Sequence, residues 1–61
     1  MNDLYDLIIY DNEDGETVDK FSAEHLTNFR SVGEYIIVSS TQRERDHCYP
    51  LPRYAFYFEA R

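Results

Sequence analysis

The chain has 61 residues, of which twelve are acidic and six are lysine or arginine, so its net charge at pH 7 is −6. This length fits a single domain, residues 1–61, whose small core leaves its expected stability marginal. Cys48 is the only cysteine, which excludes a disulfide within these residues and favours a reducing compartment. The four Phe and six Tyr are therefore the main groups available to build a core.

The sequence also bears on location. No basic segment followed by an apolar stretch opens it, and its longest apolar runs fall far short of the ~20 residues that span a bilayer. We therefore expect a soluble protein of the cytoplasm, either of a bacterial cell or of a phage-infected host, without membrane contact.

The negative charge is concentrated in the first part of the chain. Met1–Glu24 holds eight of the twelve acids and a single base, Lys20. Such a segment repels phosphates, which argues against direct binding of nucleic acid or an anionic membrane through this part. The charge distribution favours a protein partner with a basic surface.

The first predicted unit is a β-hairpin. Leu4–Asp11 alternates as a strand does and places Leu7 and Ile9 on one face. Asn12–Gly15 ends in Asp-Gly, a pair typical of hairpin turns. Glu16–Phe21 then returns as the second strand.

A helix is predicted next, over Ala23–Val32. Ser22 is a favourable helix N-cap, and Gly33 stands where a helix C-terminus favours glycine. Three apolar residues lie between them at near-helical spacing: Leu26, Phe29 and Val32.

Two more strands complete the expected fold. Glu34–Thr41 is rich in β-branched residues, and Arg53–Ala60 places Tyr54, Phe56 and Phe58 on one face. Gln42–Pro52, between them, is polar and then interrupted by prolines, and reads as a loop. The sequence therefore predicts an α+β domain of ββαββ order: a small four-stranded, mostly antiparallel sheet with one helix packed on one face.

Candidate metal sites are weak. If Gly15 were the glycine of an EF-hand loop, the first and last ligand positions would be Tyr10 and Phe21, which cannot serve. His25, His47 and Cys48 are too few for a structural zinc site. We expect no metal and no cofactor.

Catalysis is not expected either. His47 and Cys48 are neighbours on an extended segment, so their side chains point in opposite directions and cannot form a nucleophile–base pair. The two glycines are too far apart for a phosphate-binding loop. We expect a protein that is not an enzyme.

The acids of the first hairpin form one candidate binding surface. Same-face carboxylates two positions apart on a strand lie ~6.6–6.8 Å from each other, the scale of neighbouring phosphates on a nucleic-acid strand. The alternative is that these acids only keep an aromatic-rich domain soluble. The carboxylates concerned are Asp6, Asp11, Glu13, Asp14, Glu16 and Asp19.

The tyrosines form a second candidate surface. A four-stranded sheet covered by one helix has one open face, and Tyr10, Tyr49 and Tyr57 would form a protein-binding patch there. The alternative is that most tyrosines lie at the edge of the core.

These features favour a small acidic inhibitor or modulator that binds a nucleic-acid-handling protein stoichiometrically. In size, acidity and lack of catalytic residues the chain resembles the small inhibitors that bacteriophages use against host enzymes, such as anti-restriction, anti-CRISPR and uracil-DNA-glycosylase inhibitor proteins. The resemblance is one of profile, since no motif carries it. The alternative is an interaction module that self-associates, as a homodimer for example, or docks a partner through its open tyrosine face or an edge strand.

Overall fold

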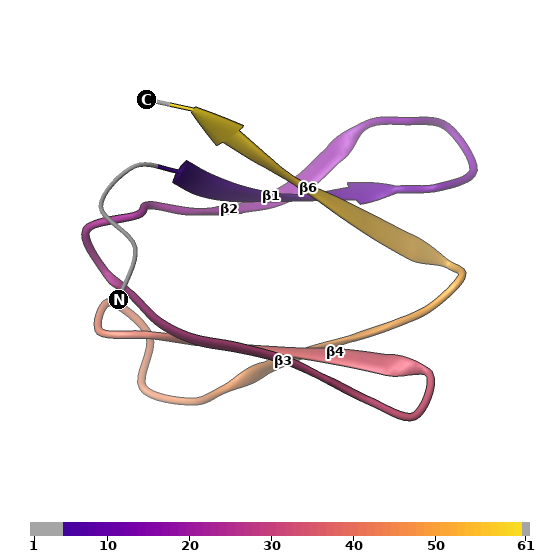
Figure 1. The fold of residues 1–61 in the computed structure, drawn as a ribbon. Helices are drawn as coiled ribbons and strands as arrows, with labels where there is room; N and C mark the ends of the chain where they lie inside the picture. The colour runs from indigo at the N-terminus through magenta and orange to yellow at the C-terminus, as the bar shows by residue number, and fades with distance from the viewer. Residues whose placement is uncertain (1–4, 61) are drawn as a thin grey trace.

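A computed structural model describes residues 5–60, which form six β-strands and no helix (Figure 1). Within these residues there is accordingly no helix long and apolar enough to cross a membrane. The strands are β1 (Tyr5–Asp11), β2 (Thr17–Phe21), β3 (Leu26–Val32), β4 (Tyr35–Ser40), β5 (His47–Pro50) and β6 (Tyr54–Ala60).

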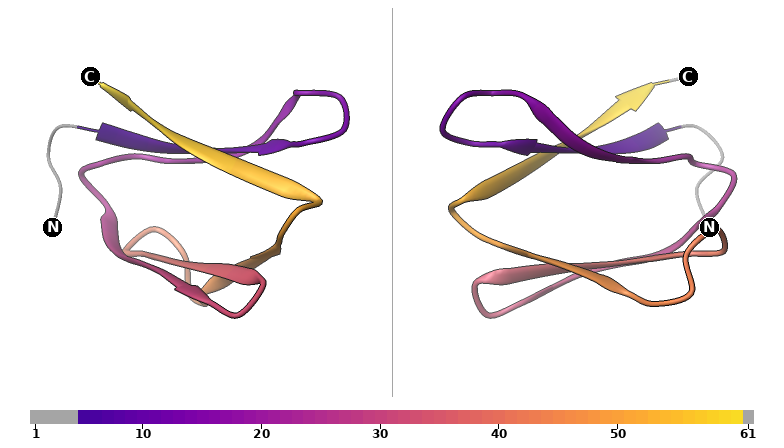
Figure 2. Two further views of the ribbon diagram at one scale, coloured as in Figure 1. Left: turned by 45° about the vertical axis from the view of Figure 1, so that its right-hand side comes forward. Right: turned by 180° about the vertical axis from the view of Figure 1, so that it is seen from behind.

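The strands form two antiparallel sheets of three strands each. The first sheet has the order β2-β1-β6 and the second the order β3-β4-β5. The sheets lie one above the other as the two layers of a sandwich, and the chain crosses between them after β2 and again after β5 (Figures 1 and 2). Each layer therefore has a central strand, β1 or β4, and two edge strands.

The core lies between the layers. It is formed by alternate residues of the strands, because successive side chains of a strand point to opposite faces of its sheet. Six apolar side chains, each at most 2% exposed, form its central cluster: Leu7, Ile9, Phe21, Leu26, Ile36 and Val38.

The first hairpin and its faces are confirmed. β1 pairs antiparallel with β2, and Leu7 and Ile9 point into the core. Gly15 has a positive φ of 77° in the connecting turn, a conformation that glycine adopts without steric cost. The later strands predicted over 34–41 and 53–60 are confirmed as β4 and β6.

The predicted helix is wrong. The chain makes one turn after Ser22, whose carbonyl accepts hydrogen bonds from the backbone N–H groups of His25 and Leu26. It then continues as β3 instead of adding further helical turns. A helix needs several turns to offset its nucleation cost, and β3 contains Thr27 and other residues of low helix propensity. The Ser22 signal was therefore a turn signal.

The helix-like spacing of apolar residues in β3 has a different cause. The pairing of β3 with β4 shifts register between Leu26 and Asn28. A β-bulge of this kind inserts one residue, so that Leu26 and Phe29 both pack against the core although they are three positions apart. Val32 is 53% exposed and belongs to no helix face. The bulge therefore gives the apolar residues of this strand the spacing that is typical of an amphipathic helix.

The α+β prediction is therefore overturned, since the described residues are all β. A second error contributed: the polar, proline-containing segment 42–52 holds β5, which pairs with β4. Pro50 cannot donate a ladder hydrogen bond, and it is tolerated because β5 is an edge strand. Without a helix to cover one sheet, two small sheets cover each other.

Candidate protein-binding surface

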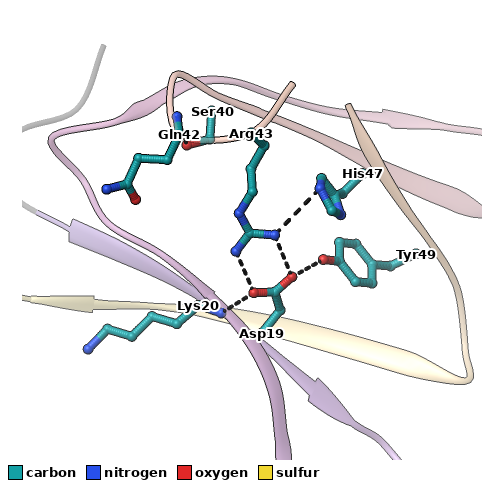
Figure 3. Close-up of polar contacts among 7 residues, drawn as sticks. All are labelled: Asp19, Lys20, Ser40, Gln42, Arg43, His47 and Tyr49. Atoms are coloured by element: carbon teal, nitrogen blue, oxygen red, sulfur yellow. Dashed lines mark hydrogen bonds and ion pairs between the residues drawn. The ribbon is translucent and has the colours of Figure 1, made fainter. Parts of the chain in front are cut away.

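One side of the sandwich, between β2 and β5, is closed by a charged network around Asp19 (Figure 3). Two guanidinium nitrogens of Arg43 donate to the two carboxylate oxygens of Asp19, at 2.7 and 3.1 Å. The hydroxyl of Tyr49 donates to Asp19 Oδ2 at 2.6 Å, and the backbone N–H of Lys20 donates to Asp19 Oδ1 at 2.9 Å. One carboxylate therefore joins β2 to β5 and to the loop before it.

The network holds Asp19 ionised. Partial burial on its own raises the pKa of Asp19, but the hydrogen bonds from Arg43 and Tyr49 outweigh it and lower the pKa to about 2. Burial and the hydrogen bond to Asp19 both raise the pKa of Tyr49. Tyr49 therefore stays a neutral donor and Asp19 a charged acceptor over the physiological pH range.

Aromatic rings extend this network into the core. The guanidinium carbon of Arg43 lies 4.5 Å from the centre of the Phe21 ring. The His47 ring packs edge-on to Phe21, with centroids 5.9 Å apart. No pocket opens beside the network within the part of the chain that the structure describes. The contacts of Asp19, Arg43 and Tyr49 fit a bridge between the two sheets rather than a place to bind substrate.

The acids of the first turn partly serve the turn itself. Asp11 is buried, accepts the backbone N–H of Glu13 at 2.8 Å and lies 3.3 Å from the Arg53 guanidinium. Asp14 accepts the backbone N–H of Glu16 at 2.9 Å. Arg53 also lies 3.7 Å from the Glu13 carboxylate. Turn geometry and one arginine thus account for much of the acidic run.

Asp6 is likewise a structural acid. It accepts the backbone N–H of Ala23 at 2.8 Å and so fixes the crossing from β2 to β3. The Lys20 ammonium lies 3.8 Å from it. Of the six acids singled out in the sequence, the structure brings together Glu13, Asp14 and Glu16 as an exposed group at the tip of the first hairpin. Asp6, Asp11 and Asp19 have partners within the fold.

The three candidate tyrosines do not share one surface. Tyr10 and Tyr57 lie on the outer face of the first sheet, with ring centroids 5.8 Å apart. Tyr57 is 45% exposed and lies opposite Ile8, which is only 4% exposed. Tyr49 instead lies between the sheets, bound to Asp19. The structure thus leaves a smaller tyrosine pair, part of whose role is to cover Ile8.

The other side of the sandwich, between β6 and β3, is lined by phenylalanine rings. Phe29 lies 4.9 Å from Phe56 and 5.6 Å from Phe58, measured between ring centroids. Phe56 is 36% exposed and Phe58 is 42% exposed, although both point toward the core side of their sheet. We name these three residues the phenylalanine cluster. It leaves apolar surface in water beside an edge strand.

The backbone of β6 is also open along this side. β6 is the edge strand of its sheet and pairs only with β1. The carbonyl of Arg53 accepts from the Asn12 backbone N–H, at 3.0 Å, in the same register as the β1–β6 ladder. Residues of an antiparallel strand alternate in pointing both backbone groups to one neighbour or the other. Phe56 and Phe58 therefore direct their N–H and C=O groups away from β1.

The other three edge strands carry features that discourage pairing. β2 is short, and its pairing with β1 is irregular beside Tyr10. β3 has the bulge near Leu26 and an exposed Arg30, and β5 has only four residues and contains Pro50. β6 has seven residues in continuous register, with one charge, Glu59. Bulges, short length, charge and proline are the features by which proteins protect edges, and β6 has almost none of them.

The metal-ligating and thiol groups of residues 5–60 are scattered. Within residues 5–60 no three His, Cys, Asp or Glu residues are grouped to hold a metal ion. Cys48 is an exposed free thiol on β5. Sequence reasoning did place Tyr54, Phe56 and Phe58 on one face, but it could not show that β6 would be an edge strand. Comparison with known proteins adds no assignment: no protein-family model, no curated protein and no solved structure matches the chain.

Proposed function

We propose that this chain is a small protein-binding module that modulates its partner by stoichiometric binding, with β6 as the contact strand. The partner adds an extended segment to the free edge of β6, and its apolar side chains cover the phenylalanine cluster. Strand addition of this kind takes its affinity from backbone hydrogen bonds and its specificity from alternate side chains. The open edge of β6 is the observation that carries the proposal.

Two further features support it. Phe56 and Phe58 retain exposed apolar surface that a partner can remove from water, at about 25 cal/mol per Å². Arg53 and Glu59 flank this apolar segment, in keeping with an interface that has an apolar centre and a polar rim. We place the protein in the cytoplasm of a bacterial cell or a phage-infected host, where its free Cys48 thiol is stable.

A matched pair of variants tests the role of β6. Phe56→Ala and Phe56→Pro both remove the ring, but only proline removes the outward N–H while sparing the ladder to β1. We expect affinity capture from a bacterial lysate to be weakened by Phe56→Ala and lost with Phe56→Pro. Amide hydrogen exchange on the captured complex should show protection of Phe56 and Phe58. Equal capture by both variants, with no new protection on β6, contradicts the proposal.

A second candidate function rests on the acidic tip of the first hairpin. Glu13, Asp14 and Glu16 are exposed there, and the turn that bears them extends past the end of the other layer (Figure 2). Among the described residues, Arg53 is the one cation within ion-pair distance of them. We propose that this tip contacts a basic, nucleic-acid-binding surface when the partner has one.

Salt separates this candidate from the first. Attraction between clustered opposite charges weakens as the Debye length falls from about 30 Å at 0.01 M to about 8 Å at 0.15 M salt. We expect Glu13→Gln, Asp14→Asn and Glu16→Gln together to weaken binding and to flatten its salt dependence. Binding that is unchanged by the triple variant rules out the acidic tip and leaves β6 as the contact.

A further inference from the structure

We infer that the segment which adds to β6 is β6 of a second copy of this chain, paired antiparallel about a two-fold axis at Phe56. This inference rests on the proposed function and names its partner. The product is a continuous six-stranded sheet of the order β2-β1-β6-β6-β1-β2. Three observations favour this occupant, and the side chains select the register.

The first observation is the phase of the backbone. In an antiparallel pair with Phe56 opposite Phe56, residues two positions apart on either side also face each other, so Tyr54 lies opposite Phe58. Phe56 and Phe58 point their N–H and C=O groups outward. In this register these groups face outward-pointing groups of the second copy and can form hydrogen bonds with them. Registers shifted by two residues keep this match, because the axis can pass through a hydrogen-bonded or a non-hydrogen-bonded pair. The backbone phase therefore allows β6 to pair with itself, and the side chains select the register.

The second observation is charge complementarity. The same register places Arg53 of each copy opposite Glu59 of the second copy, once at each end of the paired segment. Glu59 lies on the outer face of the sheet and is exposed. Arg53, the residue before β6, is also exposed and already lies within ion-pair distance of Asp11 and Glu13 of its own chain. Opposite charges directly across from each other stabilise an antiparallel pair. A register displaced by two residues in either direction loses this match.

The third observation is a pair of like charges in the first sheet. Glu59 lies directly opposite Asp6 in the β1–β6 ladder, so two carboxylates are cross-strand neighbours. Asp6 has Lys20 at 3.8 Å, whereas among the described residues no cation lies within ion-pair distance of Glu59. Like charges in this position destabilise a sheet. In the self-paired register, Arg53 of the second copy lies opposite Glu59 and can contact it in addition to Asp11 and Glu13 of its own chain.

The aromatic residues add apolar contact to this pairing. On the inner face the register sets Phe56 against Phe56 and Tyr54 against Phe58, and cross-strand aromatic pairs are among the more favourable in sheets. The exposed parts of Phe56 and Phe58 become covered. The net charge of −6 on each copy opposes association, and physiological salt screens that repulsion beyond about 8 Å.

A charge exchange tests this register. Sedimentation velocity should show a concentration-dependent dimer of the wild-type chain between about 1 µM and 1 mM. Glu59→Arg sets arginine against Arg53 at both ends of the pair, and Arg53→Glu sets glutamate against Glu59. Glu59→Arg should raise the dimer dissociation constant by about tenfold, and the double variant should lower it again. Arg53→Glu also breaks the ion pairs of Arg53 with Asp11 and Glu13, so urea denaturation of each variant separates a loss of folding from a loss of pairing.

Amide hydrogen exchange supplies the residue-level measurement. The Phe56 and Phe58 amides should become protected as concentration rises, whereas the Tyr57 amide, which points toward β1, should be protected at all concentrations. A dimer that Phe56→Pro disrupts but that shows no charge-exchange rescue overturns the register.

A chain that stays monomeric throughout this range overturns the self-pairing. The proposed function survives that result if another protein still protects Phe56 and Phe58. It fails together with the self-pairing if nothing protects these amides.

Discussion

The gap between the two sheets is closed by different kinds of contact on the two sides of the sandwich. Between β2 and β5 the gap is closed by ion pairing and hydrogen bonding, with Arg43 and Tyr49 satisfying Asp19 inside the chain. Between β6 and β3 it is lined by the phenylalanine cluster, whose rings stay partly in water beside an unpaired backbone. The first side is complete within one copy. The second is the side on which we propose that another chain binds.

The comparison predicts unequal costs of removing a phenylalanine from each side. Phe21 is 2% exposed and contacts Arg43, His47 and Tyr49. Phe21→Ala should therefore lower the free energy of unfolding by about 3–5 kcal/mol, enough to unfold so small a domain at room temperature. Urea denaturation followed by circular dichroism measures this. A Phe21→Ala chain that unfolds at the wild-type urea concentration would show that the β2–β5 side is not the closed one.

The charge bridge should be the next most sensitive feature. Asp19→Asn keeps the size of the side chain but leaves the Arg43 guanidinium without its carboxylate. We expect a loss of about 2 kcal/mol in the free energy of unfolding, since a partly buried charge loses its partner. Glu16→Gln, an exposed acid whose side chain makes no hydrogen bond or ion pair with the described residues, is the matched control and should change stability by less than about 0.5 kcal/mol. If both variants change the free energy of unfolding equally, the Asp19 bridge contributes no more to stability than an exposed acid does.

Low pH should destabilise the β2–β5 side of the sandwich, because Asp19 becomes protonated there. The folded-state pKa of Asp19, about 2, is below its ordinary value of 3.8. The stabilisation is therefore fully present above the ordinary value and is lost as pH falls from about 5 toward 2, by on the order of 1–2 kcal/mol. Denaturation at several pH values measures it. Asp19→Asn should reduce the acid sensitivity, and an unchanged pH profile in that variant would assign the effect to other carboxylates.

The smallest effect on stability is expected on the open side. Phe58 is 42% exposed, so Phe58→Thr should cost about 1 kcal/mol or less in the free energy of unfolding. Threonine also preserves strand propensity. Association through β6 should nevertheless fall sharply, as measured by sedimentation. A variant that loses several kcal/mol but still associates would reverse the assignment of the two sides.

Local patterning predicted several individual elements correctly, although the α+β fold class was wrong. The alternation around Leu7 and Ile9, the Asp-Gly turn and the β-branched run of β4 all depend on neighbours in sequence, and each became the expected element. β3 failed because a bulge after Leu26 reproduces the three-residue spacing of a helix. With only short helix signals at Ser22 and Gly33, pairing with β4 decided the structure of this segment. The architecture changed with it, since a layer of strands replaced the expected helix.

Some features of the candidate site follow from the sequence alone, and others depend on the tertiary structure. The sequence by itself determined the acidity of the first hairpin and the shared face of Tyr54, Phe56 and Phe58, because charge and strand alternation are local properties. Only the tertiary structure decided that Asp19 meets Arg43, 24 positions away, and that β6 is an edge strand. Pairing across sheets depends on which strands become neighbours, and that choice is made by the free energy of the whole core rather than by any single segment.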